Sequence, residues 1–148
     1  MAFTEQLSQG LGLPVSSLWP TNQAIATNNF ITAIPLKHFK RLMGHVMQGL
    51  GAGTFTCYFC GCNTTNGTYA ALTPNTTMVL NAVNTEGTLE VRSDQFNAGN
   101  QFAQLTITCA GTSSNVAASV YAGESHYKPG NQFDTTVTSV TLISRVVV

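Results

Sequence analysis

The sequence predicts an all-β protein with a single domain, and three observations support this prediction. Charged residues make up only 8% of the 148 positions, against about a quarter in an ordinary soluble domain. Much of the difference is taken up by Thr, which favours strands, and by Asn and Gly, which favour turns. Apolar and polar residues also alternate over short stretches that turn signals separate. This pattern is typical of a β-sandwich or jelly roll.

By composition, the chain divides into an irregular N-terminal arm, residues 1–29, and a β-sandwich domain, residues 30–148. The arm contains Pro14 and Pro20, and proline disrupts both helices and strand ladders. No regular structure is therefore expected between Pro14 and about residue 30. Such an arm is either a frayed terminus or a segment that becomes ordered on a neighbouring subunit, and the sequence does not decide between them.

Within the domain, most apolar residues recur at every second position, as in half-buried strands. Strands are expected at residues 30–34, 53–62, 78–83, 88–92, 102–109, 116–122 and 137–148. Residues 39–48 are ambiguous, because their apolar residues are spaced as on a helix: Phe39, Leu42, Met43, Val46 and Met47. However, Gly44 lies in the middle of that stretch and no capping residues flank it, which disfavours a helix.

The four cysteines raise the question of a metal site. Cys57 and Cys60 form a C-x-x-C pair, and Cys109 could complete a tetrahedral zinc site with them and Cys62. On a strand, however, Cys57 and Cys60 point to opposite faces, so a shared ion would need a bulge at Gly61. We therefore predict structural thiols and no metal, with Cys57 and Cys109 in the core and Cys60 or Cys62 exposed.

Catalytic and cofactor-binding patterns are not found in the sequence. It contains neither a nucleophile elbow nor a glycine-rich phosphate loop. Glu90 and Asp94 could share one face of a strand, but Arg92 lies between them, which favours an outward polar face over a catalytic pair. We therefore expect no enzyme activity, no catalytic residues and no cofactor.

Charge and hydropathy give expectations about partners and location. The formal net charge is zero, and the only basic cluster is Lys37, Lys40 and Arg41, so nucleic-acid binding is not expected. No apolar run reaches transmembrane length, so membrane insertion is not expected either. The first residues lack the basic and apolar regions of a signal peptide. Synthesis in a reducing cytoplasm, with the cysteines as thiols, is therefore expected.

Four segments together resemble a group of small virion proteins of tailed bacteriophages. They are Lys37-His-Phe-Lys-Arg41 with the run to Gly49, residues 54–62, the pair Thr88-Leu-Glu-Val-Arg-Ser-Asp-Gln-Phe96 and Gln101-Phe-Ala-Gln-Leu-Thr-Ile107, and residues 116–129 ending in His126-Tyr-Lys-Pro129. The resemblance covers residues 37–129 and implies that residues 39–48 form a strand. The cysteine-rich strand and the N-terminal arm depart from the group's pattern.

The resemblance implies a capsid decoration, or cement, protein that binds the outer shell of the virion and stabilises it. The implied partners are the major capsid protein and further copies of this chain, as a trimer or, second, a dimer. Interfaces of this kind use apolar and aromatic anchors. The candidate anchors are Phe3, Trp19, Phe30, Tyr121, Tyr127 and Phe133.

Two other functions are compatible with the sequence. One is a neck, tail or head-fibre component of a virion, which would differ from a decoration protein mainly in copy number. The other is a carbohydrate-binding β-sandwich module, for which Tyr58 and Tyr69 are the candidate stacking residues.

Overall fold

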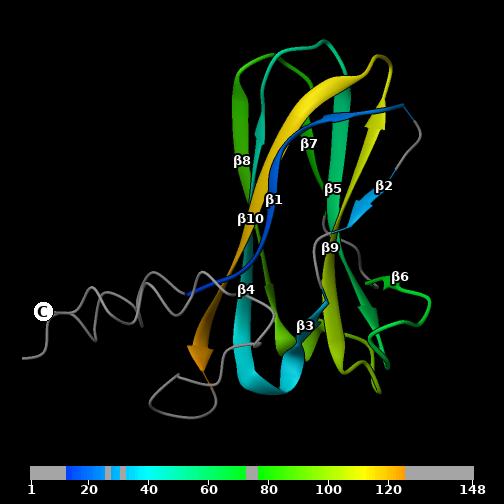
Figure 1. Ribbon diagram of the computed structural model, residues 1–148. Helices are drawn as coiled ribbons and strands as arrows, with labels where there is room; N and C mark the ends of the chain where they lie inside the picture. Colours follow the sequence, from blue (N-terminus) through cyan, green and yellow to red (C-terminus); the bar gives the residue numbers. More distant parts are fainter. Residues whose placement is uncertain (1–12, 26–27, 31–32, 73–76, 126–148) are drawn as a thin grey trace, which may run out of the picture.

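The computed structural model describes residues 13–25, 28–30, 33–72 and 77–125. In these ranges the chain forms two antiparallel β-sheets that face each other (Figure 1). The only helical elements described are the short 3₁₀ turns η1 (Leu36–His38) and η2 (Ser93–Gln95). The predicted all-β, sandwich-like fold is therefore confirmed. No helix in the described ranges has the length and apolar character needed to cross a membrane.

The first sheet has four strands, and its two edges are formed by strands far apart in sequence. Their order across the sheet is β1 (Leu13–Gln23), β10 (Ser114–Ser125), β4 (Phe39–Gln48) and β8 (Thr85–Arg92). Each neighbouring pair is antiparallel. The first and last described strands of the chain therefore lie side by side.

The second sheet has six strands, several of them short. The main path is β2 (Asn28–Phe30), β9 (Phe102–Ala110), β5 (Thr54–Cys62) and β6 (Ala70–Ala71). In addition, β3 (Ile34–Pro35) pairs with β9, and β7 (Thr77–Leu80) pairs with β5. The long β5–β9 ladder forms the centre of this sheet.

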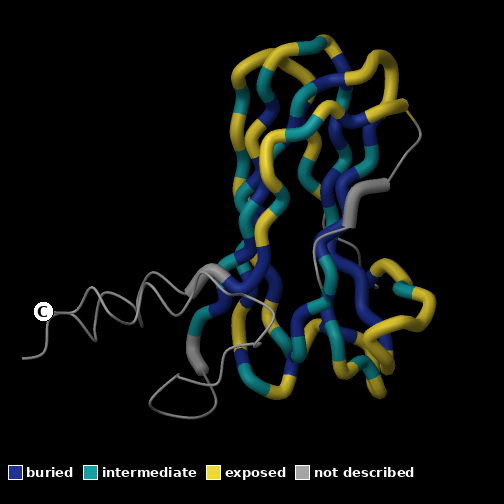
Figure 2. Tube along the Cα trace, in the orientation of Figure 1, coloured by how far each residue is buried: buried dark blue, intermediate teal, exposed yellow. Residues whose placement is uncertain are grey.

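The hydrophobic core fills the space between the sheets, as the buried residues in Figure 2 show. Every second residue of the long strands points into it. The largest fully buried hydrophobic side chains are Phe55, Phe59, Ile34, Leu42, Leu105, Ile107, Val46, Val116 and Val120. A Cβ atom added to Gly44 would lie 3.0 Å from Leu105 and 3.5 Å from Phe59, so this glycine allows the two sheets to approach closely.

Residues 39–48 form strand β4, as the phage-protein resemblance implied, and the helical alternative is wrong. Leu42, Gly44 and Val46 face the core at strand spacing. Met43 and Met47, which contributed to the helical spacing, lie on the other side of the sheet. A glycine costs little here because the facing side chains fill the space above it.

The predicted lack of regular structure between Pro14 and residue 30 is wrong, because Leu13–Gln23 forms strand β1. Its prolines are tolerated because β1 is an edge strand, where one side of the ladder is open. Pro20 also falls in an irregular part of the register, between Leu18 and Thr21. Residues 1–12 lie outside the described ranges.

The other predicted strands are mostly confirmed, with shifted boundaries. Residues 53–62, 78–83, 88–92, 102–109 and 116–122 correspond to β5, β7, β8, β9 and β10. The single strand expected at residues 30–34 is instead two short strands, β2 ending at Phe30 and β3 beginning at Ile34. The strand expected at residues 137–148 lies outside the described ranges.

Candidate interaction surface

The outer face of the four-stranded sheet is the side turned away from the core. On β1, Leu18 pairs with Ala118 and Thr21 with Val116, so Trp19 and Pro20 lie beside Ala117 in a bulge. Because Leu18 packs against the core, Trp19 points outward, and it is 81% exposed. A tryptophan this exposed is unusual, since its large apolar ring normally contributes to a core or an interface.

The outer face continues from β1 onto the neighbouring strands β10 and β4. Ala117 of β10 pairs with Met47 of β4, which is 41% exposed. In the next rows Ser119 pairs with His45 and Tyr121 pairs with Met43, all half-buried. On β10 the outward residues Ala117 and Ser119 are therefore small. Larger apolar side chains flank them, with Trp19 on β1 and with Met43 and Met47 on β4.

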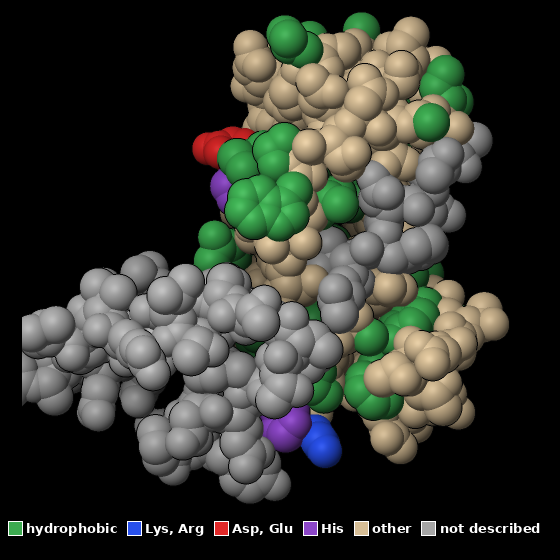
Figure 3. Space-filling model, in the orientation of Figure 1, with side chains coloured by type: hydrophobic (Ala, Val, Ile, Leu, Met, Phe, Trp, Pro, Cys, Tyr) green, Lys and Arg blue, Asp and Glu red, His purple; other side chains and the backbone are tan. Residues whose placement is uncertain are grey.

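Charged groups lie at the β8 side of the outer face. Arg41 contacts Glu90 at 3.0 Å and His45 contacts Glu86 at 3.1 Å, both between β4 and β8. These pairs are largely solvated, so each contributes little to stability. The outer face is therefore apolar toward β1 and charged toward β8. Figure 3 shows hydrophobic side chains grouped beside a histidine and an acidic side chain on this part of the molecule.

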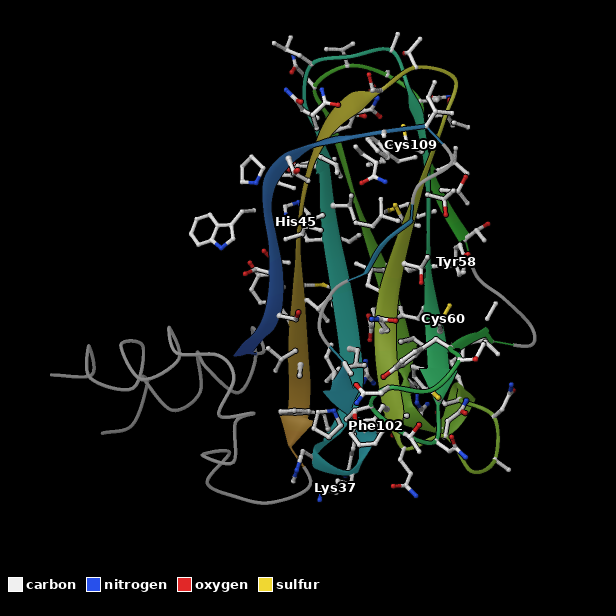
Figure 4. The ribbon with its side chains drawn as sticks, turned by 45° about the vertical axis from the view of Figure 1, so that its right-hand side comes forward. Lys37, His45, Tyr58, Cys60, Phe102 and Cys109 are labelled. Atoms are coloured by element: carbon white, nitrogen blue, oxygen red, sulfur yellow. The ribbon has the colours of Figure 1, made fainter. Side chains whose placement is uncertain are left out.

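The outer face of the six-stranded sheet has a different composition. Tyr58 and Cys60 of β5 lie along it, while His45 belongs to the opposite sheet (Figure 4). Cys60 is 4% exposed, and its Sγ lies 3.3 Å from the Oγ1 of Thr106, which is also buried. The prediction of an exposed thiol at Cys60 or Cys62 is therefore wrong.

Cys62 is buried by the loop that follows it. Its thiol lies against Gly67, where an added Cβ would approach Sγ to 2.5 Å, and it donates to Oδ1 of Asn63 at 3.7 Å. Burial raises the pKa of Tyr69, and the neighbouring Cys62 thiol raises it further. The hydroxyl of Tyr69 donates to the carbonyl oxygen of Thr65 at 3.2 Å. The alternation of residues along β5 could not reveal that Cys62 is buried, because the turn after β5 folds back over that strand.

The four cysteines are free thiols, and Cys57 and Cys109 lie in the core as predicted. Burial raises the pKa of Cys57 to about 12. Burial also raises the pKa of Cys60 and Cys109, although hydrogen bonds with Thr106 and with the Ser114 backbone partly oppose it. Thiolates are the reactive and metal-binding form of cysteine, so the native state disfavours both kinds of chemistry at these three positions. Across the described ranges, no group of three or more His, Cys, Asp or Glu residues is placed to hold a metal ion.

A shallow cavity of about 370 Å³ opens near η1 and η2. Its lining residues are Pro35, Leu36, Lys37, Ser93, Asn100, Gln101 and Phe102. Lys37 is the one charged residue in that lining, and it has no acid, histidine or thiol beside it there. The cavity therefore presents hydrogen-bonding groups without a pair suited to proton transfer.

Two of the six predicted anchors lie on the same surface. Trp19 and Tyr121 both belong to the outer face of the four-stranded sheet. Phe30 is the last residue of β2, in the other sheet. Phe3, Tyr127 and Phe133 lie outside the described ranges. Met43 and Met47 were not among the predicted anchors, although strand spacing over residues 39–48 would have placed both on the outer face.

No protein-family model and no curated protein matches the chain. One similar solved structure is that of a Bacillus endospore appendage protein, from a study describing a novel family of disulfide-linked pili. The two chains are 18% identical, with 76% of this chain and 93% of that chain covered, and the TM-score is 0.42. A similarity at this level assigns neither a family nor a function.

Proposed function

We propose that the protein is a structural subunit that acts by binding other protein subunits, specifically as a decoration protein on the outer shell of a tailed-phage capsid. The observation that supports this proposal is the outer face of the four-stranded sheet, where Trp19 is 81% exposed and Met47 is 41% exposed. Exposed apolar surface of this kind is typical of a protein–protein contact. The specific capsid role comes from the sequence resemblance.

The physical contribution of such a contact can be estimated. Burying the exposed part of one tryptophan removes on the order of 150 Å² of apolar surface from water, which contributes about 4 kcal/mol before association costs. One such contact is weak, but a symmetric shell repeats it many times.

The proposed partners are the major capsid protein and further copies of this chain, as a trimer or, second, a dimer. The place of action is the capsid surface, after synthesis in the host cytoplasm. Under this proposal the protein performs no chemical reaction. It adds buried area across boundaries between shell subunits and so resists rupture by the packaged DNA.

The experiment is quantitative mass spectrometry of virus particles purified from a host that carries the gene. A copy number of the same order as that of the major capsid protein is expected. A few copies per particle would instead indicate a neck, tail or head-fibre component, and absence from particles would refute the virion role.

A matched pair of variants tests the surface itself. Trp19→Thr should lower the number of bound copies at least tenfold, because it removes the main exposed anchor. Leu50→Thr is the control, since Leu50 is 71% exposed in the loop after β4 and lies off the sheet. Equal occupancy for the two variants would show that the outer face is not the contact.

A further inference from the structure

The two edges of the four-stranded sheet differ in charge. The β8 edge carries Glu86, Glu90 and Arg92, and charged side chains discourage pairing with another strand. The β1 edge has no Asp, Glu, Lys or Arg in its 11 residues. In the described part of the chain, β1 pairs with β10 alone, so its other side is open. The uncharged edge is therefore the one suited to receiving a further strand.

The open edge is held at a fixed geometry by its packing. Val15 is 5% exposed and belongs to the core, and Leu18 packs against it. These contacts and the ladder to β10 keep the backbone of β1 extended, with its remaining N–H and C=O groups directed away from the sheet. Pro14 and Pro20 each lack an N–H and can leave a gap in such a ladder, and a register shift accompanies each of them, so continuous pairing is expected around Ser16–Leu18.

The chain itself contains a segment with matching properties. Residues 137–148 read Val-Thr-Ser-Val-Thr-Leu-Ile-Ser-Arg-Val-Val-Val, with apolar residues at four of the six even positions (Val140, Leu142, Val146 and Val148) and at three of the six odd positions. The segment has 12 residues and one charge, Arg145, so it nearly matches β1 in length and brings no charge repulsion. It lies outside the described ranges, and residues 126–136 join it to the end of β10.

The connection restricts which copy can supply this strand. All ladders between the described strands are antiparallel, so a strand added to β1 is expected to run in the direction of β10. For full-length pairing within one chain, residues 126–136 would have to return along the whole of β1, which is about 36 Å long. Eleven fully extended residues span at most about 40 Å, and the turn sequence Lys128-Pro-Gly-Asn131 shortens that reach.

We propose that the open edge of β1 receives residues 137–148 from a second copy of the chain, as an antiparallel strand. The main-chain ladder would provide the affinity, and the apolar side chains of the added strand would extend the inner face of the sheet. The donor segment (residues 137–148) and the acceptor strand (β1) differ, so the copies can assemble either as a closed ring or as a dimer in which each copy donates its segment to the other. The inference deepens the self-association part of the proposed function, and it can fail while shell binding through the outer face stands.

Mixed disulfide formation tests this pairing directly. One preparation carries Ser17→Cys on β1, and the other carries a single cysteine at one of positions 141–144. After mixing and mild oxidation, a disulfide between the two chains is expected at alternate positions of the four, because Cα atoms must come within about 7 Å. The native thiols are buried and should react slowly. Thr88→Cys on the β8 edge, in place of Ser17→Cys, is the control and should give no bond.

Two outcomes of this experiment would overturn the proposal. One is the absence of a bond at all four positions. The other comes from a third preparation that carries both cysteines in one chain: a bond that forms there, with none between the two single-cysteine chains, would assign the strand to its own copy.

Light scattering on the whole chain gives an independent readout. The intact protein should show a multiple of 15.7 kDa, and the double variant Leu142→Pro/Ile143→Pro should reduce it to a single chain, because one of two successive N–H groups on the added strand must face β1. A truncated chain ending at residue 136 should behave likewise and should bind a synthetic peptide of residues 137–148. A monomeric intact protein, or an unchanged mass for the Leu142→Pro/Ile143→Pro variant, would refute the inference. Leu50→Thr, which lies outside β1 and the outer face, should leave the mass unchanged. Particle occupancy of the double-proline variant is a separate readout, so loss of self-association and loss of shell binding can be distinguished.

Discussion

The outer faces of the two sheets differ in what they leave exposed. On the four-stranded sheet, Trp19 and Met47 expose large apolar side chains to water. On the six-stranded sheet, Cys60 and Thr106 are buried although they point away from the core. The six-stranded face therefore covers its Cys60–Thr106 pair within the chain, although Val79 is 54% exposed there, whereas the four-stranded face exposes the larger Trp19 and Met47, which a partner could cover.

This difference shows that strand alternation fixes which side of a sheet a residue occupies, but not whether that side is covered. Three predictions test the contrast, from the largest expected effect to the smallest.

The first prediction concerns the thiols of β5 at alkaline pH. The pKa of Cys57 is about 12 in the folded protein and about 9 in the unfolded chain. Between these two pKa values the unfolded chain loses the Cys57 proton while the folded protein keeps it. The stability that the protonated thiol contributes is therefore complete below pH 9 and is lost as the pH rises toward 12. Between pH 9 and 11 the free energy of unfolding should fall by roughly 2 kcal/mol from this group.

Urea denaturation at several pH values measures this loss. Cys57→Ala is the control, since it lacks the ionisable group and should lose about 2 kcal/mol less over the same range. Parallel pH profiles for the two proteins would show that the Cys57 thiol is accessible to solvent in the native state.

The second prediction concerns the closed outer face. Thr106→Val should lower the free energy of unfolding by about 1 kcal/mol, because it leaves the buried Cys60 thiol without its partner hydroxyl. Thr56→Val is the matched control on the same face, because Thr56 is only half-buried and should change stability by less than about 0.5 kcal/mol. Equal effects in chemical denaturation would mean that this face is not closed by the Cys60–Thr106 contact.

The third prediction concerns the open outer face. Trp19→Thr should change the free energy of unfolding by less than about 0.5 kcal/mol, because the side chain is mostly in water and threonine keeps the strand propensity. Val15→Ala on the same strand should cost about 2 kcal/mol, since Val15 belongs to the core. A large loss for Trp19→Thr would show that Trp19 serves the fold and not a partner.

Much of the fold follows from local alternation. Residues 102–110 alternate so regularly that β9 and its inward Leu105, Ile107 and Cys109 could be predicted directly. Of the surface, Trp19 and Tyr121 could be named as anchors because large aromatic residues outside a predicted core suggest contacts. Their shared face could not be predicted, because the β1–β10 pairing joins residues about 100 positions apart.

The sequence by itself determined the fold class, the positions of β5, β8, β9 and β10 and the core location of Cys57 and Cys109, because a period of two is a local property. Only the tertiary structure decided the strand state of β1, the role of Gly44 and the burial of Cys60 and Cys62. Each of these depends on a distant segment: β10 beside β1, Leu105 above Gly44, Thr106 beside Cys60. For Cys62 the deciding contact is a turn that folds back over its own strand. Such contacts form only when the chain is packed, so no local pattern records them.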